Sequence, residues 1–192
     1  MLKAFVAACA VAFFTAALSA APSSAQEIIH ALTGTVSSID NAGKTITVFQ
    51  DSGATGVVYQ QLNNPKTRIS FDKHIQPETV SATQFDKQGA YVIVFYFGGD
   101  GDRTVVALES LGTGPFQSTN GTVSHYDGHG HTLTIQDESG KPQTFKIIDK
   151  TVAETGMGAV DGASYHADKG DRVRIVSSTV DGSPTALFVR EM

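Results

Sequence analysis

The stretch that decides the fold is GTVSSIDNAGKTITV, residues 34–48, which recurs as GTVSHYDGHGHTLTI at residues 121–135. The two stretches align without a gap. Farther along, DKQGAYVIV at 86–94 matches DKGDRVRI at 168–175 after a one-residue gap. Self-similarity over this much of a chain indicates a tandem duplication. We therefore expect two copies of one small unit, over residues 26–112 and 113–192.

Each copy has the sequence pattern of successive β-strands. Alternating Thr and β-branched residues at 45–48 and 132–135 predict half-buried strands that follow hairpin turns. Val36 and Ile39 lie three positions apart, so a β-bulge is needed for both to face inward. Pro77-Glu78-Thr79 can open a short helix. Further strands are expected at 57–62, 91–97 and 104–110 in the first copy, and at 144–148, 172–177 and 185–189 in the second.

The predicted fold class is all-β, with two tandem small five-stranded OB-like β-barrels, each with a short helix or loop between strands 3 and 4. The pattern Gly-x-Val-x-x-Ile/Tyr-Asp is followed by Thr-Ile/Leu-Thr-Val/Ile, and then by Gly-x-x-Val before a last strand. This pattern resembles uncharacterised OB-like repeat domains of exported bacterial proteins. The resemblance covers both copies and implies a fold and a compartment, with no activity attached.

The N-terminus has the pattern of a secretory signal peptide over residues 1–25. Lys3 precedes an apolar run at 4–18, and small polar residues lead to Ala25, after which we expect cleavage. The run is shorter than the ~20 apolar residues that a transmembrane helix needs, so no transmembrane anchor is expected. The only cysteine, Cys9, lies within this peptide, so the mature chain can form no disulfide. A cysteine-free exported chain suits a periplasmic or secreted bacterial protein.

Charge argues against nucleic acid as a partner. The whole chain carries a formal net charge of −5, and removal of the signal peptide takes away Lys3 and no acidic residue. Phosphate contacts need clustered Lys and Arg side chains, which a mildly acidic chain of this composition does not offer. We therefore expect no nucleic-acid binding.

The first marked difference between the copies is a histidine-rich hairpin. Copy two has His125, Asp127, His129 and His131 where copy one has Ser38, Asp40, Ala42 and Lys44. Imidazole and carboxylate ligands suit Zn or Cu, so these four residues are a candidate surface metal site. The alternative is a polar hairpin tip in which Asp127 is kept for turn geometry and the histidines are solvated.

The second difference is the aromatic strand YVIVFYF at 91–97. Period-two alternation places Val92 and Val94 toward the barrel core. The outer face is then made by Tyr91, Ile93, Phe95 and Phe97. An apolar face of this size is normally covered. The second copy or residues 27–29 can cover it from within the chain; a protein partner, self-association or an apolar ligand are the alternatives.

These observations predict an exported, non-catalytic binding or scaffold module of the bacterial cell envelope. The sequence contains no nucleophile elbow, His-Glu-x-x-His motif or phosphate loop, so we expect no enzyme activity. One alternative is a periplasmic transition-metal-binding protein that uses the histidine hairpin. The other is an oligosaccharide-binding OB protein, since faces of this fold bind such polymers.

Overall fold

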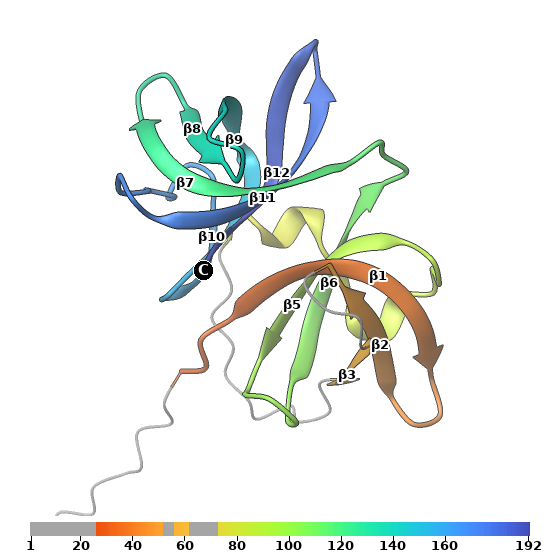
Figure 1. Cartoon of the computed structure of the whole chain (residues 1–192). Coiled ribbons are helices and arrows are strands. Elements are labelled where there is room, and N and C mark those ends of the chain that lie inside the picture. Colours follow the sequence, from red (N-terminus) through yellow and green to blue (C-terminus); the bar gives the residue numbers. More distant parts are fainter. Residues whose placement is uncertain (1–25, 52–55, 62–72) are drawn as a thin grey trace, which may run out of the picture.

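The computed structural model describes residues 26–51, 56–61 and 73–192 of the chain. Within these ranges the backbone forms strands and two short 3-10 turns, and it contains no α-helix. The all-β prediction is therefore confirmed. The predicted signal peptide, residues 1–25, lies outside the described residues. Figure 1 shows strands β1–β6 gathered in one half of the molecule and β7–β12 in the other, which we call the first and second units.

The first unit contains a closed five-stranded barrel. Its strands are β1 (His30–Asp40), β2 (Thr45–Gln50), β3 (Gly56–Gln61), β5 (Tyr91–Phe97) and β6 (Thr104–Gly112). Strand β1 pairs with β2 and β5, β2 pairs with β3, and β5 pairs with β6, all antiparallel. A parallel pairing of β3 with β6 closes the ring. The short β4 (Val80–Ser81) adds to the edge of β6.

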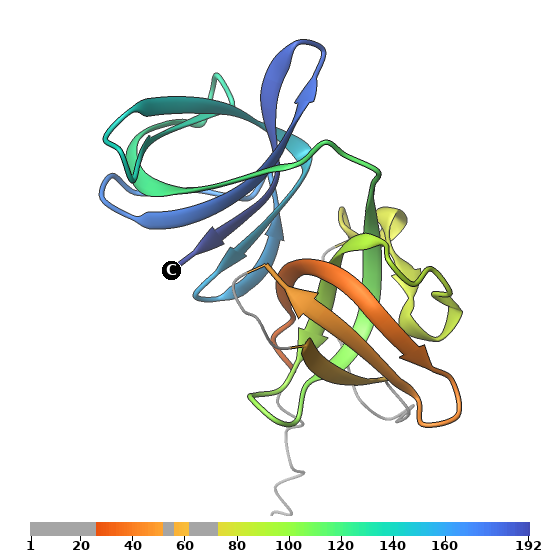
Figure 2. The same ribbon diagram turned by 45° about the vertical axis from the view of Figure 1, so that its right-hand side comes forward.

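The second unit repeats this order of pairings. Its strands are β7 (Gln117–Asp127), β8 (Thr132–Asp137), β9 (Pro142–Thr155), β10 (Gly158–Asp161), β11 (Arg172–Val180) and β12 (Ser183–Glu191). Strand β7 pairs with β8 and β11, β8 with β9, and β11 with β12, while β9 runs parallel to β12. Strand β10 folds back on β9 as an added hairpin. Figure 2 shows the connection from β6 to β7 crossing between the units.

The predicted bulge is present in both units. The register of the first strand shifts between Val36 and Ser38, and again between Val123 and His125. The bulged Ser37 hydroxyl donates to the Thr47 carbonyl oxygen at 3.1 Å. The corresponding bond in the second unit, from Ser124 to the Thr134 carbonyl oxygen, measures 3.0 Å. The bulge therefore turns Val36 and Val123 into the two barrel cores, where both are buried.

Glycine is required at the same point of each first strand. A Cβ on Gly34 would lie 2.4 Å from the Phe49 carbonyl oxygen, and one on Gly121 would lie 2.5 Å from that of Gln136. Both contacts are with backbone, which cannot move aside without disturbing the neighbouring strand. The repeated glycine thus allows the first and second strands to approach closely.

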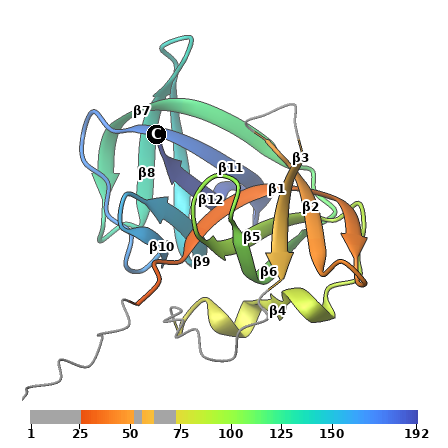
Figure 3. The same ribbon diagram turned by 90° about the horizontal axis from the view of Figure 1, so that it is seen from below.

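The segment between the third and fourth barrel strands differs between the units. The sequence predicts a short helix opening at Pro77-Glu78-Thr79, and the structure has a single 3-10 turn at Gln76–Glu78, with proline near its start. A second 3-10 turn, Ala82–Gln84, follows β4. Figure 3 shows these turns lying along one side of the first unit. In the second unit, β10 and a turn occupy the corresponding place.

A third apolar cluster, which we call the inter-unit core, lies between the two units. Val92 and Val94 face the first barrel core as predicted, whereas Ile93 and Phe95 point the other way and are 0% exposed. The buried members are Ile29, Ala31, Ile75, Ile93, Phe95 and Ala107 from the first unit, with Val152, Val176 and Phe188 from the second. The outer face of β5 is therefore covered by the second unit.

Truncation of this core should be costly. We expect Phe95→Ala to lower the free energy of unfolding by about 3 to 5 kcal/mol, because it leaves a cavity at a fully buried aromatic position. Phe49→Ala, at a side chain that is 50% exposed, should cost less than about 1 kcal/mol. Urea unfolding of both variants measures the difference. Equal losses would mean that the second unit does not cover Phe95 in solution.

Candidate functional site

The four aromatic-face residues occupy different environments. Ile93 and Phe95 are buried in the inter-unit core, whereas Tyr91 and Phe97 are partly exposed and pack at its margin. Cover from within the chain was one of the expected alternatives to a partner protein, and the structure shows this cover. Ile93 and Phe95 consequently keep no exposed surface for a partner. Tyr91 remains accessible and becomes the starting point for a different site.

A polar network anchors the inter-unit core beside Tyr91. The Asp51 carboxylate accepts hydrogen bonds from the Thr33 hydroxyl at 2.6 Å and from the Tyr91 hydroxyl. It also forms an ion pair with Arg174 of the second unit at 3.3 Å, and both side chains are largely buried. The Arg174 guanidinium in turn donates to the Ser118 hydroxyl at 3.0 Å. Burial, followed by the neighbouring Asp51 carboxylate, raises the pKa of Tyr91, so its hydroxyl remains a donor.

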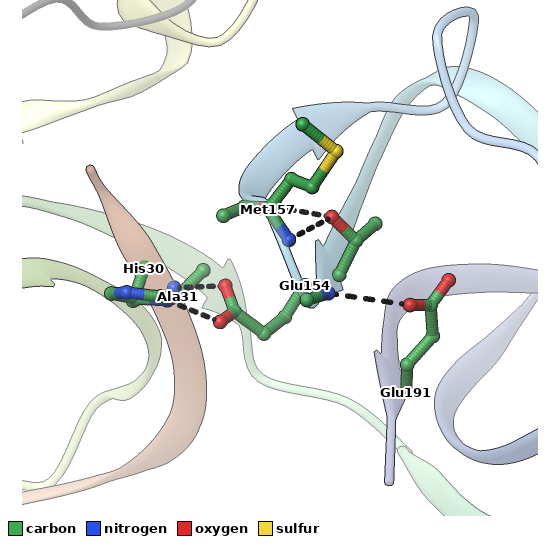
Figure 4. A network of polar contacts seen from close by, with 8 residues as sticks. His30, Ala31, Glu154, Met157 and Glu191 are labelled. Carbon is green, nitrogen blue, oxygen red and sulfur yellow. Dashed lines mark hydrogen bonds and ion pairs between the residues drawn. The ribbon is translucent and has the colours of Figure 1, made fainter.

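A second polar link joins β1 to β9, as Figure 4 shows. One Glu154 carboxylate oxygen lies 2.7 Å from His30 Nδ1, and the other accepts from the Ala31 backbone N–H at 2.6 Å. Burial raises the pKa of the Glu154 carboxyl, and the His30 and Ala31 hydrogen bonds partly oppose that effect. The carboxyl therefore ties two backbone segments that are far apart in the chain.

A third group of charges lies on β6 and the first 3-10 turn. Lys150 of the second unit is 2.8 Å from a Glu78 carboxylate oxygen. Glu109, directly opposite Ile93 in the β5–β6 register, is half-buried nearby. Burial, and then the Glu78 charge, raise the pKa of Glu109 to about 7, although Lys150 acts in the opposite direction. Three ion pairs thus cross the boundary between the units: Asp51–Arg174, His30–Glu154 and Glu78–Lys150.

The histidine hairpin has the geometry of its counterpart in the first unit. Asp127 accepts backbone hydrogen bonds from His129 at 3.0 Å and Gly130 at 2.9 Å. Asp40 accepts the same two bonds, at 2.9 and 2.8 Å, one unit earlier. These bonds, that of Gly130 most of all, lower the pKa of Asp127. The turn-forming alternative therefore accounts for Asp127.

The structure does not bring the predicted metal ligands together. Across the described ranges, no group of three or more His, Cys, Asp or Glu side chains is arranged to hold a metal ion. His131 instead occupies the left-handed position of the turn, with φ of 50°, as Lys44 does with φ of 53°. The four residues His125, Asp127, His129 and His131 thus share a hairpin without forming a coordination group.

A groove of about 750 Å³ opens where the outer face of β5 emerges from beneath the second unit. We define it by the side chains of Thr35, Lys87, Gln88, Tyr91, Ser110 and Phe116. The Tyr91 and Phe116 rings pack with centroids 4.9 Å apart. Tyr91 is therefore held by Asp51 at its hydroxyl and by Phe116 at its ring. This is the described hollow that best combines apolar rings with groups able to form hydrogen bonds.

A smaller hollow of about 270 Å³ lies on the other side of Phe116. It is lined by Pro115, Phe116 and Gln117 of the connection, together with Ser177, Thr179 and Pro184. Phe116 thus separates two hollows, one on each unit. The sequence comparison did not identify Phe116, Asp51 or Arg174. Two signs were available, neither of which by itself indicated a site. One was an aromatic residue in the connection after Gly112, and the other was the presence of Arg172 and Arg174 where the first copy has its aromatic face.

Comparison with known proteins adds no family assignment. Neither the protein-family models nor the curated proteins contain a match to this chain. The structure adds one observation on membranes. Within residues 26–51, 56–61 and 73–192, no helix has the length and apolar character that a membrane span requires.

The two hairpins provide a matched test of the role of Asp127. Asp127→Ala and Asp40→Ala should lower the unfolding temperature by similar amounts, because each removes an acceptor for two backbone N–H groups. Thermal unfolding followed by circular dichroism, with and without added Zn, measures both effects. A stabilisation by Zn that disappears in Asp127→Ala but persists in Asp40→Ala would instead support a metal site at the second hairpin.

Glu109 should make the stability of the protein depend on pH. Its folded pKa, about 7, exceeds the ordinary value of 4.5, so its stabilising contribution is full below about pH 4.5 and is lost as the pH rises through 7. Glu109→Gln stays neutral. It should leave stability unchanged near pH 4.5 and raise the free energy of unfolding by about 1 to 2 kcal/mol above pH 7, after allowance for partial exposure.

Urea unfolding at several pH values measures this effect. Glu138→Gln, at an exposed carboxylate of the second unit, is the control and should change little. If Glu109→Gln gave the same small change at every pH, Glu109 would be solvated and ionised rather than held at the boundary between the units.

Proposed function

We propose that the mature chain is an exported, non-catalytic binding or scaffold module of the bacterial cell envelope, built from two tandem OB-like barrels over residues 26–112 and 113–192. The strand order supports this fold, because each unit has five strands in which one parallel pairing joins the third to the last, as expected for a five-stranded Greek-key barrel of the OB type. The repeated bulge and the repeated glycine support a common origin of the two units.

The observation that carries the functional proposal is the inter-unit core with its polar margin. Nine buried apolar residues fill the boundary, and Asp51–Arg174, His30–Glu154 and Glu78–Lys150 bridge it at the edges. Two barrels fastened in this way act as one body, whereas barrels on a flexible linker move independently. A rigid pair can present a groove of fixed shape at its junction, which is the property a binding module needs.

Two carboxyl groups with raised pKa values, those of Glu109 and Glu154, have structural surroundings. Glu154 is engaged by His30 and the Ala31 backbone, and Glu109 lies beside Glu78 and Lys150. Neither residue lines the groove beside Tyr91. Perturbed carboxyls often mark catalytic sites, but ion-pair networks that hold a structure together perturb pKa values as well. These contacts support a structural role for both carboxyls.

Rotational diffusion tests the proposal. In ¹⁵N relaxation measurements on residues 26–192, both units should report one correlation time, that of the whole molecule. A double variant, Phe95→Ala with Arg174→Ala, should give each unit a shorter and separate correlation time while its barrel signals persist. Two independent correlation times in the unsubstituted protein would contradict the rigid module.

Export is tested separately. When the full chain is expressed in a Gram-negative host, osmotic shock should release a protein whose measured mass equals that of residues 26–192, with Gln26 as its first residue. Recovery in the cytoplasm with an intact N-terminus would contradict the assignment to the cell envelope.

A further inference from the structure

The outer surface of the first barrel carries a row of side chains that runs into the groove. Thr35 of β1 is paired directly with Phe49 of β2 on one side and with Tyr91 of β5 on the other. Directly paired residues share one face of a sheet, so Phe49, Thr35 and Tyr91 form a row across three strands. Neighbouring strands lie about 4.8 Å apart, which places the two aromatic positions about 10 Å apart.

This row is open to solvent, unlike the middle of the same face of β5. The next residues along β5, Ile93 and Phe95, are covered by the second unit, whereas Phe49 is half exposed and Tyr91 is partly exposed. Phe116 packs against Tyr91 and forms a wall of the groove. Aromatic rings held by packing and by a hydrogen bond, as Tyr91 is by Phe116 and Asp51, offer flat apolar surface at little cost in conformational entropy.

The polar groups around these rings are suited to hydroxylated ligands. Thr35 and Ser110 supply hydroxyls, and Gln88 supplies an amide carbonyl, with its NH₂ group already bonded to the Ser37 carbonyl oxygen at 2.6 Å. The C–H face of a sugar ring can stack on an aromatic ring while its hydroxyls bond to such groups. A spacing of two strands between aromatic positions fits a chain of sugars better than a single one.

Charge selects among saccharides. Lys87 is the one charged residue among those that line the groove, and no carboxylate lines it. The Asp51 carboxylate, which accepts from the Tyr91 hydroxyl, is also paired with Arg174 and with the Thr33 hydroxyl. A single cation on a chain with a net charge of −5 favours a sparsely charged anion and disfavours a nucleic acid, which needs many cations along its backbone.

From this arrangement we infer that the groove beside Tyr91 and Phe116 binds an acidic oligosaccharide, with sugar rings on Phe49, Tyr91 and Phe116 and a carboxylate at Lys87. The inference rests on the proposed function, because Phe116, which forms a wall of the groove, belongs to the β6–β7 connection and packs against the inter-unit core. It names the ligand class that this rigid module takes.

The probes are oligogalacturonate and its fully methyl-esterified form, which share a backbone and differ in charge. Each is titrated into residues 26–192 and followed by ¹H–¹⁵N chemical shifts and by calorimetry. We expect shifts at residues 87–91 and 110–116 and at Phe49, with affinity at least about threefold weaker for the ester, as for loss of a partly exposed ion pair.

The duplication offers a matched control. Lys169 stands in the second unit where Lys87 stands in the first, since DKQG at 86–89 corresponds to DKGD at 168–171. Lys87→Gln should weaken binding of oligogalacturonate about threefold, whereas Lys169→Gln should leave it unchanged. Phe49→Ala and Phe116→Ala should each weaken binding about three- to tenfold through loss of stacking. Phe49 is exposed, so its substitution leaves the fold intact.

Three results would overturn the inference. They are the absence of shifts with either probe, equal affinities for the acid and the ester, and equal effects of Lys87→Gln and Lys169→Gln. If the units share one correlation time and neither probe binds, the saccharide inference is wrong and the rigid module stands. If the units tumble independently, the proposed rigid module is wrong, whatever the titration shows.

Discussion

Ile93 and Phe95 project from the first barrel on the side away from its own core, and two such side chains cannot remain in water without a large cost in free energy. The second unit removes them from water by supplying Val152, Val176 and Phe188. Burial at this boundary then brings charged groups together that are far apart in the chain. Asp51 reaches Arg174, and His30 reaches Glu154, because the apolar contact has already fixed the distance between the units.

The differences between the copies are understood most simply as complementary halves of one contact. The first copy has an apolar outer face on its fourth barrel strand, and the corresponding strand of the second copy carries Arg172 and Arg174. Arg174 does not line an independent surface of the second barrel but pairs with a carboxylate of the first. The two units thus differ in sequence on surfaces that contact each other, with an apolar strand on the first and an arginine on the second.

Sequence periodicity was sufficient for the barrel walls but not for the junction between the units. Alternation in 45–48 and 132–135, the spacing of Val36 and Ile39, and the inward position of Val92 and Val94 follow from local steric rules, so each could be predicted. Phe116 and Asp51 acquire their roles only when the units dock, and no local pattern encodes a docking geometry. The prediction for His125, Asp127, His129 and His131 rested on residue type alone. The alternative, in which Asp127 is kept for turn geometry, did anticipate the backbone hydrogen bonding that Asp127 shares with Asp40.

The contact of the N-terminal segment with the second unit has a consequence for the order in which the chain folds. The Ile29 carbonyl oxygen accepts a hydrogen bond from the Ala159 N–H at 2.7 Å. Ile29 and Ala31 are buried in the same cluster as Val176 and Phe188, which lie near the C-terminus. During synthesis the first half of the chain appears before the second, so the strand YVIVFYF emerges before Val152, Val176 and Phe188 can cover it. During that interval the strand is a β-prone, uncharged segment of the kind that aggregates. Folding of the first unit alone therefore leaves an aggregation-prone strand until the second unit is complete.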